Sequence, residues 1–379
     1  MKKTLDSIEE AIEAIRNGEI IIVVDDEDRE NEGDFLVATR SVTPEVINFM
    51  ATHGRGLICA PLIESKCDEL GLDLMVQQNS AQFETPFTVS VDLVGHGTTT
   101  GISASDRAKT CQALINANTQ PEDLGKPGHI FPLRAKEGGV LRRAGHTEAA
   151  VDFSRLAGFE PAGVIVEIMN EDGTMARLPE LLQIADKHNL KIVSIEDLIA
   201  YRLEKESLIE REKEVTLETK YGEFNMIAFK QISTDTEHLA LVKGEWEEDE
   251  PIAVRVHSSS MIGDIFQTNN FGKGPQLHLA MQQINEAGKG AIVYINKLRE
   301  GGGLLDEMKA YAEIKEEKKH GTVVNKMDSK DYGIGAQILR NLGVTKMKLL
   351  TNTSERRTGI IGYGLEIVET IPLIESQTT

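Results

Sequence analysis

Residues 25–34 read Asp-Asp-Glu-Asp-Arg-Glu-Asn-Glu-Gly-Asp and follow directly on the apolar run Ile-Ile-Ile-Val-Val of residues 20–24. The apolar run predicts a buried strand, and this strand leads into seven carboxylates within ten residues. Carboxylates spaced so closely repel one another unless a cation, an arginine or protonation relieves the repulsion. The segment therefore predicts a site for a hard cation such as Mg²⁺, against the alternative of a solvated acidic loop.

A calcium loop of the EF-hand type is excluded by its spacing. If the loop started at Asp28, Gly33 would occupy the sixth position, as an EF-hand requires. The closing glutamate would then have to stand where this chain has Thr39.

A second polar segment lies more than a hundred residues further along the chain. Residues 138–149, Gly-Gly-Val-Leu-Arg-Arg-Ala-Gly-His-Thr-Glu-Ala, combine an imidazole, two guanidinium groups and a hydroxyl with glycines. Histidine complements carboxylates around a metal ion, and arginine with threonine is suited to a phosphate. The His-Thr-Glu triplet also begins the zinc-deaminase signature, but that signature needs two later cysteines, and no cysteine follows Cys111. A deaminase is therefore excluded.

These segments resemble 3,4-dihydroxy-2-butanone-4-phosphate synthase. The resemblance covers roughly the first half of the chain and rests on five stretches: DDEDRENEGD at 25–34, GRGLIC at 54–59, TTGISASDRAKT at 99–110, PGHIFPLRAKEGGVLRRAGHTEA at 127–149 and LAGFEPAGVIVEIMNEDGTMAR at 156–177. It implies the conversion of D-ribulose 5-phosphate into the four-carbon precursor of riboflavin, with loss of formate. It also implies an α+β fold, use of Mg²⁺ or Mn²⁺, and a homodimer whose active sites draw on both subunits.

The resemblance assigns roles to individual residues. Glu30 and His146 would bind the metal, with Glu30 as the ligand that a second ion would share. The positions expected to contact the substrate are Arg29, Glu30, Asp34, Arg143, Ala144, Gly145, His146, Thr147 and Glu167, with Arg143 and Thr147 at the phosphate. His129 and Glu167 would carry out proton transfers, and Asp26, Glu32 and Cys59 would line the same catalytic pocket.

Each of the less certain positions has a structural alternative. Asp26 and Glu32 would then only orient the loop, Cys59 would be a buried apolar thiol, and His129 a satisfied core histidine. Glu167 lies within a strand-like apolar run, where a carboxylate is costly unless it is paired or has a raised pKa. Residues 95–101 resemble a phosphate loop but lack the Gly-Lys-Ser/Thr ending, which favours a flexible loop over the site.

The composition indicates a globular enzyme. A chain of 379 residues with 40% hydrophobic residues has room for two or three domains. A net charge of −20 argues against nucleic-acid binding, and no apolar run is long enough to cross a membrane. Three cysteines without paired spacing favour a reducing compartment, so we expect a cytoplasmic protein.

Local patterns place several elements and a boundary. Ser7 and Glu10 have capping-box spacing ahead of an apolar helical face that Gly18 can end. Residues 179–188 and 195–201 predict helices, with a strand at 190–193 between them. The highly charged stretch 206–213 predicts a linker between a synthase domain at 1–205 and a second domain at 214–379.

The second domain resembles an α/β GTP cyclohydrolase II, which is often fused behind this synthase. The resemblance rests on residues 254–258, 263–266, 274–277 and 349–352. That enzyme binds zinc through Cys-x₁₀-Cys-x-Cys, but those positions contain Ser260, Phe271 and Lys273, which cannot form the site. The family's Gln-Glu-Gly-Arg stretch is scrambled around residues 297–303, and Lys330 stands in place of its catalytic arginine. The spacing of His238, His257 and His278 does not suggest a replacement zinc site.

The sequence thus predicts a synthase with a degenerate, zinc-free second domain. Such a domain could act in oligomerisation, in docking to other riboflavin-pathway enzymes, or as a nucleotide sensor. Two other hypotheses stay open: a bifunctional enzyme that also hydrolyses GTP, and a regulatory or scaffold protein in which both halves only bind.

Overall fold

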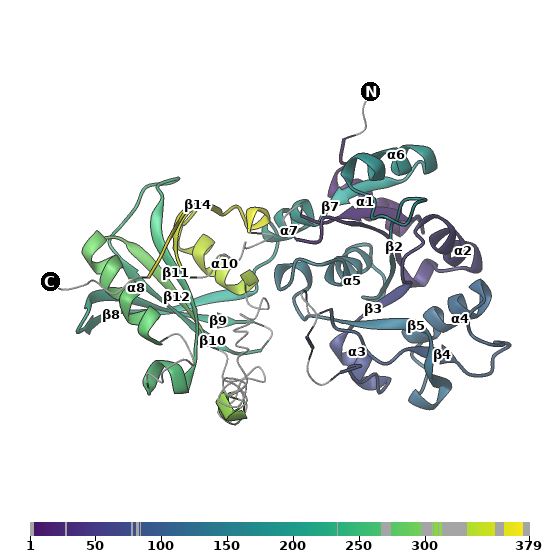
Figure 1. Ribbon diagram of the computed structural model, residues 1–379, viewed down its shortest axis with the longest axis horizontal. Helices are drawn as coiled ribbons and strands as arrows, with labels where there is room; N and C mark the ends of the chain where they lie inside the picture. Colours follow the sequence, from purple (N-terminus) through teal and green to yellow (C-terminus); the bar gives the residue numbers. More distant parts are fainter. Residues whose placement is uncertain are drawn as a thin grey trace. The chain divides into compact units, whose positions relative to one another are not determined.

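The computed structural model of the chain divides into two units, residues 1–205 and residues 206–379 (Figure 1). It describes residues 4–26, 29–76, 79–80, 83, 85–232, 234–266, 274–296, 305, 307–309, 311–312, 332–352 and 360–373. Within these residues, no helix combines the length and the apolar character needed to cross a bilayer.

Unit 1 is built around one mixed seven-stranded sheet with the order β4-β5-β3-β6-β2-β1-β7. Its strands are β1 Ile21–Val24, β2 Gly33–Ala38, β3 Cys59–Ile63, β4 Val91–Leu93, β5 Leu124–Ala135, β6 Gly163–Glu167 and β7 Lys191–Ser194. Its helices are α1 Ile8–Arg16, α2 Pro44–His53, α3 Glu64–Glu69, α4 Ala104–Ile115, α5 His146–Leu156, α6 Leu178–His188 and α7 Ile195–Leu203.

The elements predicted around the sheet are confirmed. Ser7 and Glu10 form both halves of a capping box at the start of α1. The predicted strands appear as β1 and β7, and the predicted helices near the end of the unit appear as α6 and α7. Local pattern was sufficient here because each element has either a capping residue or an uninterrupted apolar run.

Both faces of this sheet are covered by helices, and the two faces carry different kinds of side chain. Phe35 and Val37 point to one face, where a continuous apolar core joins the sheet to α2, α4 and α6. Because side chains alternate along a strand, Asp34 and Leu36 point to the other face. Helix α5 packs on that face across β2, β6, β3 and β5. Polar residues on this second face therefore converge beneath the start of α5.

The stretch predicted as a linker differs from the structure. Glu206 begins unit 2, and strand β8 Ile209–Thr219 already includes most of the residues expected to connect the domains. β8 pairs only with β9 and forms the edge of its sheet, with most of its side chains exposed. An edge strand that is exposed on both faces needs no apolar stripe, so charge alone did not distinguish it from a linker.

Unit 2 contains a second seven-stranded sheet with the order β14-β13-β11-β12-β10-β9-β8. The remaining elements are β9 Gly222–Gln231, β10 Glu237–Lys243, β11 Ile252–Ser258, β12 Gly290–Ile295, β13 Lys346–Leu350, β14 Glu366–Ile371, α8 Gly274–Ala287 and α10 Tyr332–Asn341. Strands β12, β11, β13 and β14 are parallel, and β8, β9 and β10 extend the sheet antiparallel. Helix α8 connects the parallel strands β11 and β12, as expected for an α/β domain.

Candidate active site

The acidic segment is the loop of a hairpin between β1 and β2, which are paired up to Val24 and Gly33. Arg29 lies inside this loop, 2.6 Å from a carboxylate oxygen of Asp25 and 3.0 Å from one of Glu30. Its guanidinium also stacks over the Phe83 ring at 5.4 Å. Arginine thus relieves part of the repulsion among the loop carboxylates.

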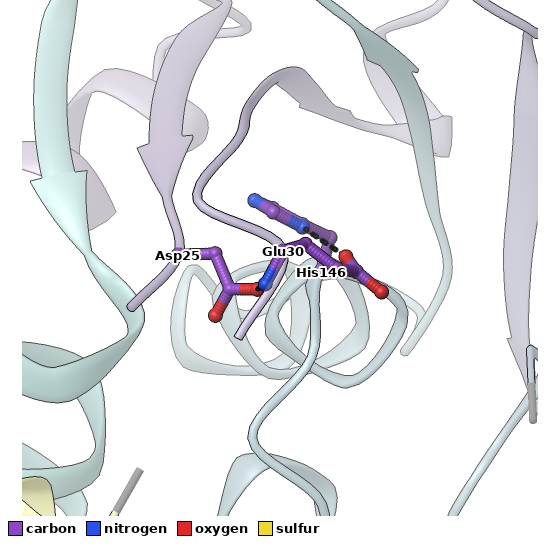
Figure 2. A group of neighbouring side chains, drawn as sticks. All are labelled: Asp25, Glu30 and His146. Carbon is purple, nitrogen blue, oxygen red and sulfur yellow. Dashed lines mark hydrogen bonds and ion pairs between the residues drawn. The ribbon is translucent and has the colours of Figure 1, made fainter. Parts of the chain in front are cut away.

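Three side chains converge where this loop meets α5. Figure 2 shows Asp25 and Glu30 from the hairpin loop and His146 from the first position of α5. One potential ligand atom of each residue lies within 4.8 Å of those of the other two. The His146 Nδ1 atom is 3.8 Å from a carboxylate oxygen of Glu30. Within the described residues, this is the one cluster of its kind.

The orientation of His146 is fixed from behind. Its Nε2 atom lies 3.1 Å from the backbone carbonyl oxygen of Val23 in β1. A carbonyl oxygen can only accept, so Nε2 carries the proton of the neutral ring and Nδ1 offers its lone pair toward Glu30. This arrangement, a ring nitrogen donating to a backbone carbonyl behind a potential ligand atom, is common for metal-binding histidines.

The charges around His146 depend on one another. Burial lowers the pKa of His146, but the carboxylates of Asp34, Glu30 and Asp25 outweigh burial and raise this pKa to about 9. Burial raises the pKa of Asp34 to about 7. Burial also opposes the ionisation of Glu30, but its hydrogen bond to His146 and the charge of Arg29 lower its pKa to about 2. The surrounding carboxylates thus favour the protonated form of His146 in the absence of a metal. A divalent cation would replace this proton as the positive charge that balances the carboxylates.

The donor set fits a divalent cation. Carboxylate oxygens and one imidazole nitrogen suit Mg²⁺ or Mn²⁺ better than a soft metal, and the Nδ1 atom of His146 faces the carboxylates. The residues that would bind the ion are Glu30 and His146, with Asp25 beside them.

Arg143 lies immediately before α5 and is held by two partners. One guanidinium nitrogen donates to the buried Glu148 carboxylate at 2.7 Å, and the other donates to the Phe83 carbonyl at 3.1 Å. Glu148 is in turn fixed by the backbone N–H of Lys136 at 3.1 Å. Beyond Arg143 come Ala144, then Gly145 at the N-cap of α5, and then the buried Thr147 in its first turn.

This arrangement favours an anion next to the metal cluster. The start of an 11-residue helix presents backbone N–H groups and the positive end of its dipole. Gly145 is needed for close packing there, because a Cβ atom at this position would lie 2.5 Å from a guanidinium nitrogen of Arg143. Arginine, hydroxyl and helix start together have the chemistry to bind a phosphate group.

Glu167 ends strand β6 directly opposite Asp34 of β2. Its carboxylate accepts a hydrogen bond of 2.8 Å from the backbone N–H of Leu57. Gly56 makes room for it, because a Cβ atom there would lie 2.4 Å from the Glu167 carboxylate. Glu167 opens into a surface pocket of about 470 Å³ whose other lining residues are Glu32, Arg55, Gly56, Leu57, Met169 and Met175.

His129 reaches the same edge of the sheet from β5. Phe131 of β5 is opposite Cys59 of β3, and Cys59 is opposite Ile165 of β6. His129 and Glu167 each lie two residues from this row in the direction of Leu57, so they are at the same end of the sheet and on the same face. His129 and Glu167 are therefore separated by two strand spacings, about 10 Å. The His129 side chain is 42% exposed and its Nδ1 atom lies 2.7 Å from an Asp92 oxygen, so it is not a core histidine.

The remaining predicted pocket residues fall in different places. Cys59 is buried, and burial, followed by the charges of Glu167 and Asp34, raises the pKa of its thiol, which keeps it protonated at neutral pH. Glu32 lines the pocket beside Glu167, and burial and the charge of Glu30 raise its pKa. Asp26 is not in the metal cluster.

Asp26 contributes its backbone, because its carbonyl oxygen accepts from the N–H groups of Arg29 and Asn31 and so closes the loop. Burial, then the charge of Asp197 and last the charge of Asp26 raise the pKa of Glu196 in α7. This placement agrees with the alternative in which Asp26 orients the loop.

Comparison with known proteins identifies the families that the two halves of the chain match. The family model of 3,4-dihydroxy-2-butanone 4-phosphate synthase matches residues 9–201, and that of GTP cyclohydrolase II matches residues 210–372. Riboflavin biosynthesis protein RibBA of Cytophaga hutchinsonii is 62% identical over 97% of this chain and 92% of its own length. RibBA of Parabacteroides distasonis is 55% identical over the same shares. This chain belongs to the 3,4-dihydroxy-2-butanone 4-phosphate synthase family.

Solved structures agree with both halves of the match. RibBX of A. baumannii, a two-domain 3,4-dihydroxy-2-butanone 4-phosphate synthase, is 41% identical and covers 97% of this chain and 99% of its own, with a TM-score of 0.64. A 3,4-dihydroxy-2-butanone 4-phosphate synthase in complex with two magnesium ions is 44% identical and covers 53% of this chain and 98% of its own, with a TM-score of 0.51.

The predicted identity and reaction are therefore confirmed. The chain is a 3,4-dihydroxy-2-butanone 4-phosphate synthase, a lyase of riboflavin biosynthesis that acts on ribulose 5-phosphate, fused to a GTP cyclohydrolase II domain.

Three residues near the synthase site escaped the sequence reasoning. Asp25 belongs to the metal cluster, Glu148 orients Arg143, and Arg177 donates to the carbonyl oxygens of Glu30 and Asn31 and so fixes the loop. Asp25 had a signal, because it is the first carboxylate after the strand and so lies nearest the sheet edge. Glu148 had a weak signal, because it follows Arg143 by only five residues. Arg177 had none beyond lying in a motif, since Glu30 and Asn31 are more than a hundred residues away.

The glycine-rich stretch 95–101, which is predicted to be a flexible loop over the site, forms several hydrogen bonds at its C-terminal end. The buried Asp106 of α4 accepts hydrogen bonds from the Thr99 N–H, the Thr99 hydroxyl and the Gly101 N–H, at 2.7–3.1 Å. The Thr98 hydroxyl donates to the Leu93 carbonyl at 2.7 Å. A carboxylate that follows the loop in the sequence thus fixes it in place.

In the GTP cyclohydrolase II domain, Ser260 is the residue that the sequence predicts at the first zinc-cysteine position. Its hydroxyl accepts from the Gly263 N–H at 3.0 Å and caps a short helical turn, Met261–Ile265. The other zinc positions, Phe271 and Lys273, lie outside the described residues, as do residues 297–303 and Lys330.

The three histidines considered for a replacement zinc site have separate partners. His238 is paired with Gln231 at 3.2 Å, and His257 with Asp264 at 2.9 Å. His278 stacks on Tyr221 with 5.0 Å between ring centroids. They are not brought together as a metal cluster in the part of the domain that the structure describes.

Proposed function

We propose that the synthase reaction takes place at the start of α5, with Mg²⁺ or Mn²⁺ bound by Glu30 and His146 and with Asp25 as a neighbouring carboxylate. The observation that carries this proposal is the convergence of Asp25, Glu30 and His146 within 4.8 Å at the edge of the sheet. A divalent cation bound there would stabilise the negative charge that develops on the sugar oxygens when an enediolate forms. The related synthase that was crystallised with two magnesium ions supports the choice of metal.

The protein's own side chains have the remaining roles. Arg143, Thr147 and the N–H groups of residues 144–147 bind the phosphate. Arg29 and Asp34 contact the sugar beside the metal ligands. Asp34 is buried beside the proposed metal ligands, and in the metal-free protein burial raises its pKa to about 7.

Glu167 and His129 transfer protons in this proposal. Glu167 removes the proton next to the carbonyl, because its carboxylate is anchored by the Leu57 N–H and faces the pocket beside Asp34. His129, from the other end of the same sheet edge, serves the departing hydroxyl and the rearrangement. Cys59 and Glu32 shape the floor and rim of the pocket.

We further propose that the synthase is a homodimer. Large apolar side chains of unit 1 are exposed, namely Leu57, which lines the pocket beside Glu167, and Leu74, Met75 and Val76. A second copy that covered them would close a pocket that is open on this side and would exclude water from the intermediates.

For the second unit we propose a zinc-free domain without GTP hydrolysis. Ser260 acts as a helix cap, and the described histidines are committed to other partners. The two-domain synthase RibBX of A. baumannii, similar over the full length, supports this choice. The family match over residues 210–372 favours the second candidate function, a bifunctional enzyme that also hydrolyses GTP.

One assay tests both halves, because both reactions release formate. The purified full-length protein is incubated with Mg²⁺ and Zn²⁺ in parallel tubes that contain ribulose 5-phosphate or GTP. We expect formate from the sugar phosphate alone. Formate from GTP at a comparable rate would overturn the zinc-free assignment.

The metal assignment is tested with Glu30→Ala. We expect it to lose at least a hundredfold in formate release, because it removes a ligand and the partner of His146. Glu19→Ala, an exposed carboxylate after α1, is the matched control and keeps full activity. Unchanged activity of the Glu30 variant would refute the site.

Two coarser proposals complete the function. We propose a cytoplasmic location, supported by three cysteines, Cys59, Cys67 and Cys111, that are buried free thiols. We also propose that unit 2 docks to other enzymes of riboflavin biosynthesis. Co-sedimentation of the full chain with those enzymes, compared with a chain lacking residues 206–379, tests the second point.

A further inference from the structure

The Asp92 carboxylate contacts two atoms of His129. One oxygen of Asp92 accepts the backbone N–H of His129 at 2.8 Å, and the other lies 2.7 Å from the ring Nδ1. The two side chains are 19% and 42% exposed. An ion pair this exposed contributes little to stability, typically below about 1 kcal/mol. Stability therefore does not explain why both carboxylate oxygens are used on one residue.

The surrounding backbone is shaped to admit this carboxylate. The pairing of β4 with β5 is irregular between Val91 and Asp92, and such a bulge redirects a side chain. A Cβ atom on Gly101 would lie 2.1 Å from an Asp92 oxygen. A Cβ atom on Gly128 would lie 2.0 Å from the Val91 backbone. The two glycines and the bulge thus leave room for the Asp92 carboxylate to reach His129.

We propose that Asp92 is a positioning residue of the synthase, which sets the tautomer and the orientation of His129. The carboxylate can only accept, so Nδ1 carries the proton of the neutral ring and Nε2 presents its lone pair outward. When Nε2 takes up a proton, the carboxylate stabilises the resulting imidazolium. This inference rests on the proposed function, in which His129 transfers protons.

His146 provides an internal contrast. Its Nε2 donates to the uncharged carbonyl of Val23, and its Nδ1 faces Glu30 in the proposed metal site. His129 is held at the opposite nitrogen and by a full negative charge. A carbonyl thus orients a potential metal ligand, whereas a carboxylate orients the ring that is proposed to transfer protons.

The experiment uses the full-length protein with Asp92→Asn, Asp92→Glu and His129→Gln. Asparagine has one accepting oxygen and cannot serve both N–H groups of His129. We expect Asp92→Asn to lower kcat for formate release by about a hundredfold to ten-thousandfold, with KM changed less than about threefold. Asp92→Glu should recover at least tenfold of that loss, since it restores a second accepting oxygen.

The tautomer is read directly from ¹⁵N shifts of labelled histidine, with the His129 signal assigned by its loss in His129→Gln. We expect the Nδ1–H form in the wild type and the Nε2–H form in Asp92→Asn. Asp106→Asn is the structural control, because Asp106 fixes the adjoining loop without contacting His129. It should lower thermal stability and leave the His129 tautomer unchanged.

The outcomes separate the inference from the proposed function. If His129→Gln is inactive while Asp92→Asn keeps kcat within threefold, or keeps the wild-type tautomer, the role of Asp92 is refuted and His129 stands. If His129→Gln is fully active, His129 is not a proton-transfer residue and the proposed function itself must change. Should Asp92→Asn fail to fold, failure of the folded Asp92→Glu to retain the Nδ1–H tautomer would overturn the inference.

Discussion

At the scale of single residues, the site is organised by what lies behind each functional group. His146 is held by a carbonyl, Arg143 by the Glu148 carboxylate and the Phe83 carbonyl, and Glu167 by a backbone N–H. These contacts are made before any substrate binds, so the side chains do not have to be ordered at the moment of reaction.

Asp25 and Asp26 offer a test at this scale, because they are adjacent carboxylates in different environments. Asp25 lies with Glu30 and His146, whereas Asp26 acts on Glu196 and closes the loop through its backbone. We expect Asp25→Asn to weaken Mg²⁺ activation of formate release by about ten- to a hundredfold, because second-sphere and ligand carboxylates have effects of this size. Asp26→Asn should change it by less than threefold.

The measurement is a Mg²⁺ titration of initial rates at saturating ribulose 5-phosphate for both variants. Equal loss in the two variants would mean that net loop charge matters and the individual position does not.

At the scale of elements, the turn that leads to Arg143 is fixed by two helices. Asp152 of α5 and Arg202 of α7 are each 3% exposed and lie 2.8 Å apart. Asp152 also accepts the Val140 N–H at 2.8 Å, and Arg202 donates to the Gly138 carbonyl at 2.7 Å. The last helix of unit 1 therefore stabilises the turn before the proposed phosphate subsite.

Removing Arg202 should uncouple that turn. Arg202→Leu leaves the buried Asp152 charge without its main partner, so we expect a loss of about 3–5 kcal/mol in the free energy of unfolding of unit 1. We also expect a higher KM for ribulose 5-phosphate, because Arg143 follows the turn. Circular dichroism melts and steady-state kinetics of the full chain measure the two effects.

Arg155→Leu is the matched control for Arg202→Leu. Arg155 is 3.8 Å from the same Asp152 carboxylate but 44% exposed, and such pairs contribute below about 1 kcal/mol. A similar loss in both variants would contradict the role given to burial.

Unit 2 has a comparable network around Asp264. This carboxylate accepts from Tyr294 at 2.8 Å and from the Ser260 N–H at 3.0 Å, and it lies 2.9 Å from His257 Nε2. Burial opposes its ionisation, but the contacts with His257, Ser260 and Tyr294 outweigh burial and lower its pKa. The network includes the backbone N–H of Ser260, the residue that the sequence predicts at a zinc-cysteine position.

The sign of the pH dependence follows from that lowered pKa. Because Asp264 is more acidic in the folded state than in the unfolded chain, its contribution is fully present above about pH 4 and is lost as the pH falls below this value. We expect Asp264→Asn to destabilise unit 2 by about 1–3 kcal/mol at pH 7 and to weaken its acid sensitivity. Urea unfolding of both proteins at pH 7 and pH 3.5 decides the point. If the variant loses as much stability between pH 7 and pH 3.5 as the wild type does, groups other than Asp264 cause the acid sensitivity.

At the scale of the whole molecule, the two units can be followed separately. Trp246 is the single tryptophan of the chain and lies in unit 2, so tryptophan fluorescence reports on that unit alone. A chelator should abolish formate release from ribulose 5-phosphate and leave the thermal melt followed by Trp246 unchanged. Structural zinc contributes directly to folding, so a melt lowered by chelation would reveal a zinc site in unit 2.

Much of the molecule could be predicted without coordinates. The capping box of α1, the apolar run of β1 and the strand–helix alternation of unit 1 are local signals, and they match the structure. The edge strand β8 was missed because its charged, exposed side chains carry no alternating apolar pattern. The contacts of Asp106 with Thr99 and Gly101 could not be predicted, because they depend on how the loop folds back onto the start of α4.

The sequence by itself determined the family, the reaction and the set of chemical groups, because long irregular motifs specify residue types at fixed spacing. Only the tertiary structure decided which of two neighbouring aspartates joins Glu30 and His146, and which nitrogen of each histidine is held. Those choices depend on strand register and on contacts between residues more than a hundred positions apart, such as Val23 with His146. Local sequence cannot predict these choices, because each depends on which backbone segment lies next to the side chain after folding.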